Sequence, residues 1–244
     1  MIIIKSKLFE EFGNLKFGFS TKIGLERNVP FYFNLSYSVG DDKTIVAENR
    51  KAFLEKFGLD EESTVFQKQV HGDGVTIIKN TGIFPESDAL ITAEKNIGLA
   101  VSSADCVPVF LYDSGNEIIS AVHSGWRGTE KKILAKTLKI LKEKFNSNPG
   151  NISAFIGPSI SCENYRVGDE VAEKFDSQFI EEKDDGFYLD LKKANKNMLL
   201  EFGLTENRIE IPELCSFKKN DMLHSYRRDG LTSGRALGII KMEK

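Results

Sequence analysis

The chain has 244 residues, of which 41% are hydrophobic and 28% charged, and its formal net charge is −3. This composition is typical of a globular protein long enough to bury a sizeable core. The weak negative charge argues against sequence-independent binding to nucleic acid, which depends on a basic surface. No apolar run is long enough for a membrane span or a signal-peptide core, and three cysteines without close pairs make no disulfide framework. We therefore expect a cytoplasmic protein with reduced thiols and no membrane partner.

Strand-like runs rich in β-branched and aromatic residues recur along the whole chain. The segment HGDG, after the second of these runs, predicts a tight hairpin turn with His71 at its tip. The expected strands, in chain order, are Lys16–Phe19, Thr64–Val70, Val75–Lys79, Ala89–Thr92, Gly98–Val101, Val107–Tyr112, Ile118–Val122, Ile152–Ile156, Arg208–Ile211 and Ala236–Met242.

Three segments show helical periodicity instead. The first has its apolar stripe between Ile45 and Leu54 and is closed by Gly58. The second has its stripe between Ile133 and Phe145, with Thr129 predicted as its N-cap, and the third follows Asp190 and stops at Gly203. Many strands with few, unevenly placed helices predict an α+β fold, in which helices cover a mixed sheet. No Pro/Gly/Ser-rich linker divides the chain, so residues 1–244 are expected to form one domain.

Three metal-capable side chains stand at the ends of apolar runs: His71 in QVHGDG, Cys106 in SSADCVPVF and His123 in AVHSGWRG. Glycine or small residues flank each of them and leave room for a ligand. Two imidazoles and a thiolate with one free position are the arrangement of a catalytic zinc centre. Considered singly, each residue would more often be a hydrogen-bonded histidine or a small buried hydrophobe. The spacings between the three match no short metal motif. Their occurrence together favours a metal site.

Arginines near these segments suit an anionic substrate. Arg127 lies in HSGWRGTEKKIL, close to a predicted helix start, and the loop SYRRDGLTSGR carries Arg227, Arg228 and Arg235. The alternative is that these arginines pair and pack at the surface. Asp105, beside Cys106, is expected to orient a ligating histidine, to act as a base, or to cap a turn. Cys162 and Cys215 have no metal or redox spacing and are expected to be structural.

Read together, these motifs resemble the YfiH-type purine nucleoside phosphorylases, a family also described as multicopper polyphenol oxidases of the laccase-domain type. The resemblance spans nearly the whole chain and rests on GFSTKIG, NLSYSVGDD with VAENR, QVHG, SDALIT, GLAVSSADCVPV, AVHSGWRGT, IGPSISCENYRVGDEV, LDLKKAN and SYRRDG with GR.

The resemblance implies a layered α/β sandwich with mixed sheets and zinc held by His71, Cys106 and His123. It implies phosphorolysis of adenosine, inosine, guanosine and S-methyl-5'-thioadenosine, and deamination of adenosine, with a purine nucleoside and phosphate as partners. It also places Asn34 and Arg50 in the substrate pocket, although the local sequence of Arg50 reads as a surface helix. The chain departs from the family at Thr21–Leu25, where a TRxGG-like segment is usual, and at His224, where an aromatic residue is typical.

Copper fits the sequence less well than zinc. Three histidines cannot supply both a blue-copper centre and a trinuclear copper cluster, and no nearby methionine offers the weak axial ligand of a lone blue-copper site.

Two other functions remain open. Cys106 could be the nucleophile of a hydrolase or deamidase, with His123 or His71 as its base; the YfiH-type fold also resembles that of certain deamidating bacterial toxins. A purely structural zinc staple is the third hypothesis, but structural zinc usually has four protein ligands and the chain offers three.

Overall fold

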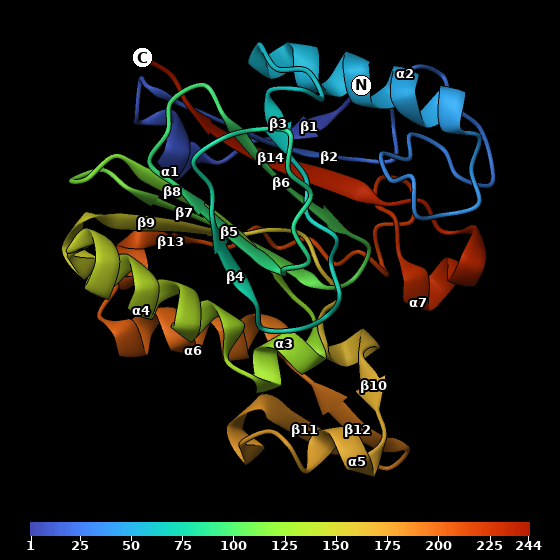
Figure 1. Cartoon of the computed structure of the whole chain (residues 1–244). Coiled ribbons are helices and arrows are strands. Elements are labelled where there is room, and N and C mark those ends of the chain that lie inside the picture. Colours follow the sequence, from blue (N-terminus) through green and yellow to red (C-terminus); the bar gives the residue numbers. More distant parts are fainter.

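Two large β-sheets lie face to face in the computed structural model, which describes residues 1–244 (Figure 1). Both mix parallel and antiparallel pairs, and together with the helices on their outer faces they confirm the predicted α+β fold of layers around mixed sheets. The five-stranded sheet has the order β1 (Ile3–Ile4), β2 (Leu15–Ser20), β14 (Ala236–Met242), β6 (Gly98–Ser103) and β3 (Thr64–Val65). The six-stranded sheet has the order β13 (Ile209–Glu210), β9 (Ile152–Ile156), β7 (Val107–Asp113), β8 (Ile118–Ser124), β5 (Ala89–Thr92) and β4 (Val75–Ile77).

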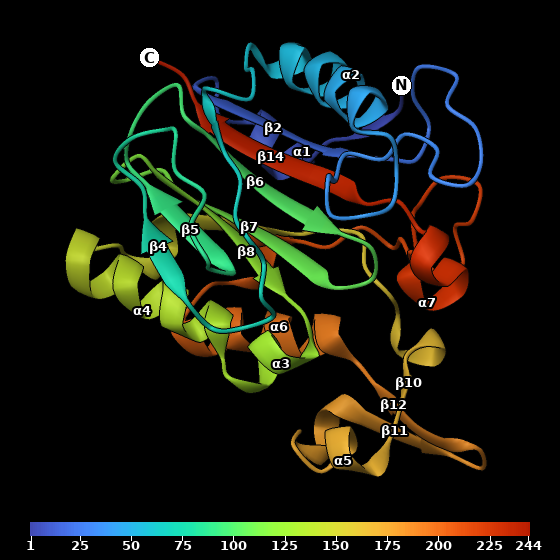
Figure 2. The ribbon, with the colours of Figure 1, turned by 45° about the vertical axis from the view of Figure 1, so that its right-hand side comes forward.

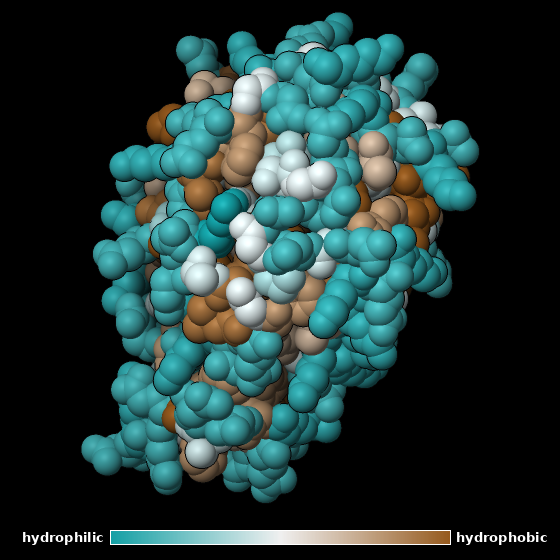
Figure 3. Space-filling view, turned by 90° about the vertical axis from the view of Figure 1, so that its left-hand side faces the viewer, coloured by the Kyte–Doolittle hydropathy of each residue, from teal (hydrophilic) through white to brown (hydrophobic).

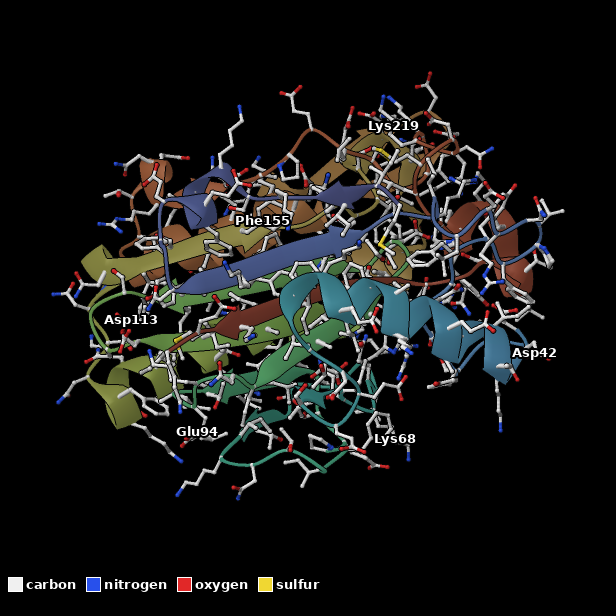
Figure 4. All side chains as sticks on the ribbon, turned by 90° about the horizontal axis from the view of Figure 1, so that it is seen from above. Asp42, Lys68, Glu94, Asp113, Phe155 and Lys219 are labelled. Atoms are coloured by element: carbon white, nitrogen blue, oxygen red, sulfur yellow. The ribbon has the colours of Figure 1, made fainter.

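Strand β7 shows how the core is divided between layers. Every residue of this strand is buried, because the six-stranded sheet is covered on both faces. Successive side chains point to opposite faces. Val109 and Leu111 therefore join the apolar cluster under the helices, whereas Phe110 and Tyr112 join the cluster between the two sheets. Phe155 of β9 belongs to the same inter-sheet cluster (Figure 4).

Three long helices cover the outer faces of the sheets (Figure 2). Helix α2 (Lys43–Leu54) lies over the five-stranded sheet, and α4 (Ile133–Phe145) and α6 (Leu191–Phe202) lie over the six-stranded one. The predicted boundaries hold for α6, since Asp190 accepts a hydrogen bond from the backbone of Lys193 and Gly203 ends the helix in the left-handed conformation. The short helices are α1 (Lys7–Glu10), α3 (Trp126–Glu130), α5 (Asp169–Ala172) and α7 (Tyr226–Asp229).

Three local predictions are wrong. The HGDG segment is not a hairpin turn, because β3 pairs with β6 in one sheet and β4 pairs with β5 in the other. The run Thr64–Val70 is a strand only at Thr64–Val65, and its remainder crosses between the two sheets. Thr129 does not cap α4: it lies inside α3, and the N-cap of α4 is Lys132 in a left-handed conformation.

A small third sheet, absent from the predicted elements, extends from the body of the molecule (Figure 2). Its order is β10 (Arg166–Val167), β12 (Gly186–Leu189) and β11 (Ile180–Lys183). Most of its residues are half-buried or exposed, and β11 reads Ile-Glu-Glu-Lys, so the apolar signal that marks the other strands is missing.

The surface is largely hydrophilic on the side shown in Figure 3, where apolar atoms form separate small patches. None of the helices has both the length and the apolar character that a bilayer crossing requires.

His224, at the position where the family resemblance predicts an aromatic residue, is buried with 3% of its surface exposed. Its Nε2 lies 3.4 Å from the carbonyl oxygen of Phe33. Burial lowers the pKa of His224 to about 3; the Phe33 carbonyl opposes this shift, and the charges of Lys22 and Arg235 add to it. The folded protein therefore holds this imidazole neutral.

This histidine should make the protein less stable in mild acid. The unfolded chain protonates His224 below its ordinary pKa of about 6.5, whereas the folded state does not, so stability falls as the pH drops from about 6.5 toward 3. At pH 5 the expected contribution is about 2 kcal/mol. His224→Phe should remove it, so urea denaturation at pH 7.5 and pH 5 should show a smaller acid-induced loss in the variant. An identical pH dependence in both proteins would contradict this assignment.

Candidate metal centre

Three segments bring His71, Cys106 and His123 together at one end of the six-stranded sheet. Cys106 directly precedes β7, and His123 of β8 pairs with Pro108 of β7, so the thiol and the imidazole meet beside the same strand end. His71 lies on the loop before β4 and has a positive φ of 56°. One ligand atom from each of the three residues lies within 4.8 Å of the others. The sequence thus predicted three side chains that the fold does bring together.

Gly125 provides the space for this cluster. A Cβ at Gly125 would lie 2.9 Å from Cys106 Sγ and 3.2 Å from His71 Cδ2. A side chain there would push the thiol and the imidazole apart, so the glycine after the β8 strand end is a requirement of the site.

Asp88 joins the two histidines. Its carboxylate is fully buried and accepts hydrogen bonds from the backbone N–H groups of Val70, His71 and Gly72, at 3.2, 3.1 and 2.7 Å. The same carboxylate lies 2.7 Å from His123 Nδ1. This contact leaves His123 Nε2 to face the cluster, in the carboxylate–histidine arrangement common around bound metals. The sequence predicted no role for Asp88, because an acid directly before an apolar strand such as Ala89–Thr92 is an ordinary residue.

Electrostatics favour the ionised thiol. Burial opposes ionisation of Cys106, but the charge of His123 and hydrogen bonds from both histidines outweigh it and lower the thiol pKa. For His123, burial lowers the pKa, whereas the Cys106 charge and the Asp88 hydrogen bond raise it and prevail. A thiolate beside two imidazoles is the form that binds a metal.

The donor set fits a tetrahedral metal with one open position. Bonds of 2.0–2.3 Å in tetrahedral geometry separate ligand atoms by about 3.5 Å, so a modest contraction of the cluster would suffice. Only three protein donors converge here, which leaves a fourth position for solvent or substrate.

Asp105 does not orient a histidine. Its carboxylate accepts hydrogen bonds from the Ser216 hydroxyl and from the backbone N–H of Arg227, both at 2.6 Å. Its contacts also differ from the predicted turn cap before β7, because they hold the start of α7, whose N-cap is Ser225. Asp105 thereby holds the C-terminal arginine segment against the residue next to Cys106.

Three of the predicted substrate-binding side chains, Asn34, Arg50 and Arg228, make their contacts within the protein. The Arg228 guanidinium makes five hydrogen bonds, to three carbonyl oxygens and both oxygens of Asp229, and a guanidinium has five donors in total. Asn34 is fully buried and accepts from the backbone N–H groups of Ser36 and Arg235. No contact joins either side chain to the metal cluster.

Arg50 lies between two aromatic rings, 4.2 Å from the centroid of Tyr37 and 4.1 Å from that of Phe66. Its Nε donates to the Leu35 carbonyl, and its Nη1 lies 3.5 Å from Glu61. The side chain is thus more buried than a surface helix position predicts, and it holds the loop that contains Asn34.

Arg127 and Arg227 are different. The Arg127 guanidinium makes no hydrogen bond within the protein and stacks on Trp126 at 4.4 Å. Arg227 uses one nitrogen, which donates to the Arg166 carbonyl, and its guanidinium lies 5.0 Å from the Tyr165 ring centroid. Both side chains are exposed, so most of their donors are available to an anion.

The other two cysteines lie apart from the cluster. Cys162 is close to Glu181, and burial together with nearby acidic groups raises its thiol pKa to about 11. Cys215 accepts from the backbone N–H of Ser161 and from Asn164, which agrees with the structural role expected for it.

Asp88→Asn should weaken metal retention about 10- to 100-fold, since an amide cannot both accept from three N–H groups and support the same histidine tautomer. Competition with a chelator measures this effect. Asp113→Asn is the matched control, because Asp113 is also buried but holds the turn at the far end of β7 (Figure 4). Equal metal affinity in both variants would show that Asp88 does not support the ligands.

Residues 16–243 match the family model described as multi-copper polyphenol oxidoreductase laccase. Purine nucleoside phosphorylase YlmD of Bacillus subtilis is 34% identical over 245 residues, which cover 93% of this chain and 88% of YlmD. A purine nucleoside phosphorylase of Haemophilus influenzae is 36% identical over 223 residues, covering 86% of this chain and 87% of that protein.

Solved structures agree. YlmD from Geobacillus stearothermophilus superposes with a TM-score of 0.91 at 30% identity, covering 98% of this chain and 94% of that one. The YfiH protein of Bacillus licheniformis gives the same TM-score and identity, covering 96% and 95%. The family predicted from the motifs is confirmed, and the chain belongs to the laccase-like YfiH family.

Proposed function

We propose that this protein is a zinc-dependent purine nucleoside phosphorylase that acts on adenosine, inosine, guanosine and S-methyl-5'-thioadenosine and also deaminates adenosine. Its relatives are named purine nucleoside phosphorylases, and its His–Cys–His cluster could hold a metal. The observation that carries the proposal is the three-donor cluster with the exposed arginines Arg127 and Arg227 on neighbouring segments.

The chemistry of the donors favours zinc over copper. Two imidazoles and one thiolate suit zinc, and the chain has too few histidines for a multicopper centre. When bound, zinc supplies a positive charge that polarises an oxygen ligand at the open position.

Phosphorolysis requires a phosphate oxygen to attack the anomeric carbon of ribose while the bond from that carbon to the purine breaks. We assign the binding of phosphate to Arg127 and Arg227, whose forked donors match phosphate oxygens. The stacked rings cover the faces of these guanidinium groups and leave their edges to bind.

In this proposal, Asn34, Arg50 and Arg228 do not contact the substrate but fix the loops around the substrate pocket. Asn34 accepts a hydrogen bond from the backbone N–H of Arg235. Burial lowers the pKa of Arg235, and the charges of Asp105 and Cys106 oppose this shift. Arg50 fixes the Asn34 loop through the Leu35 carbonyl. Arg228 fixes the loop before α7 through three carbonyl oxygens.

The direct test incubates zinc-loaded protein with each nucleoside and inorganic phosphate. Free base and ribose 1-phosphate (5-methylthioribose 1-phosphate from S-methyl-5'-thioadenosine) are the expected products of phosphorolysis, and inosine is the expected product of adenosine deamination. The absence of all these products from metal-loaded protein would refute the proposal.

Removing any one ligand should abolish both metal retention and turnover. His71→Ala, Cys106→Ala and His123→Ala each leave two donors, which should be more damaging than losing a supporting partner. Elemental analysis of the purified variants measures the zinc content. Cys162→Ala is the matched control for Cys106→Ala and should keep full zinc. A stoichiometric zinc content in any ligand variant would disprove the assignment of that ligand.

The second candidate is a cysteine hydrolase or deamidase, which the closeness of Cys106 to both imidazoles favours. Iodoacetamide distinguishes the two. A metal-bound thiolate should react only after chelation, so rapid labelling of Cys106 in zinc-loaded protein would favour the hydrolase.

A further inference from the structure

Tyr165 has a hydroxyl group that the protein leaves without a hydrogen-bond partner. The residue follows the short turn Cys162–Asn164 and precedes β10, and its backbone is fixed at both ends by the Cys162 carbonyl and the Leu189 N–H. The side chain is only half-buried, and its oxygen is not among the enclosed polar atoms. A rigidly held hydroxyl that remains accessible is available to a ligand.

The surroundings of Tyr165 are those of the candidate centre. Arg227 stacks on its ring, and the backbone N–H of Arg227 donates to Asp105, the residue before Cys106. Burial raises the pKa of Tyr165 to about 12; the Cys106 charge adds to this shift, and the charges of Arg227 and Arg127 oppose it. The hydroxyl therefore keeps its proton near neutral pH and can donate it in a hydrogen bond.

We propose that Tyr165 completes the phosphate subsite by donating its hydroxyl to a phosphate oxygen that Arg127 and Arg227 also bind. This inference rests on the proposed phosphorolysis and adds a residue to it. The two arginines supply charge, and the tyrosine supplies a neutral donor of fixed direction. A neutral donor adds no charge to the subsite and cannot form a salt bridge of its own with the Asp105 carboxylate.

A ring-stacking role for the purine base is the competing interpretation of Tyr165. The contact with Arg227 argues against it, because the guanidinium already covers one face of the ring, whereas the hydroxyl edge stays free. The two interpretations make different predictions, since a phenylalanine keeps the stacking surface and loses only the donor.

Tyr165→Phe is the test, measured on zinc-loaded full-length protein. Isothermal titration calorimetry with inorganic phosphate gives the affinity without any turnover, and steady-state kinetics give KM separately for phosphate and for inosine. The loss of one hydrogen bond to a charged oxygen should weaken phosphate binding about 10- to 100-fold and raise KM for phosphate by a similar factor. KM for inosine and zinc content should stay within about twofold of the values of the original protein. The melting temperature should stay within a few degrees of the original. Tyr188→Phe is the matched control, because the Tyr188 hydroxyl on β12 binds Asp185.

Phosphate affinity that is unchanged in Tyr165→Phe would overturn the inference, as would a change in KM for inosine alone. Failure of the proposed function has a different signature: phosphate would bind the original protein and bind Tyr165→Phe more weakly, but no nucleoside would be cleaved. If Tyr165→Phe lowers the melting temperature, the phosphate titration is repeated well below that temperature, where the variant is folded. Weaker phosphate binding by the folded variant would support the donor role, and unchanged binding would contradict it.

Discussion

The Asp88 carboxylate is the constraint on which the candidate centre depends. It is fully buried, and a buried carboxylate is stable only when its oxygens are hydrogen-bonded or paired. Its partners come from two places that are distant in sequence: three successive N–H groups around His71, and the imidazole of His123. Burial opposes ionisation of Asp88, but these hydrogen bonds lower its pKa, so the same interactions that satisfy the charge also set both histidines beside Cys106. The candidate centre is therefore a product of how β5, β8 and the loop before β4 are assembled.

Much of the fold was predictable because its strands are strongly apolar. Runs such as Val107–Tyr112 and Ile118–Val122 are buried on both faces, and helix ends such as Asp190 and Gly203 carry local signals. The HGDG turn was not predictable in the same way. Its two flanking strands separate because each finds a better partner elsewhere, β6 for one and β5 for the other, and local sequence contains no information about such distant pairing.

The candidate site divides along the same line. The three candidate ligands could be found because histidine and cysteine are rare in this chain and these three stand at the ends of apolar runs. Asp88 and Tyr165 could not, because an aspartate before a strand and a tyrosine in a polar turn are ordinary residues until the fold shows what surrounds them. Nor could sequence separate Arg227 from Arg228, which are neighbours with opposite environments. The Arg228 guanidinium uses all five of its donors in hydrogen bonds within the protein, whereas the Arg227 guanidinium uses one.

This difference matters because the protein as a whole does not attract anions. With a net charge of −3, long-range steering gives phosphate no advantage, so its binding must be decided within a few ångströms of the site. The structure meets that requirement locally. Arg127 and Arg227 lie on segments anchored next to the candidate ligands, the guanidinium of each lies against an aromatic ring, and both oxygens of Asp105 accept hydrogen bonds, from the Ser216 hydroxyl and from the backbone N–H of Arg227. These partners hold the Asp105 oxygens in place, so in the proposed function they do not compete with phosphate for the two guanidinium groups. The hydrogen bond that fixes the start of α7 is therefore also one of the two that occupy this carboxylate.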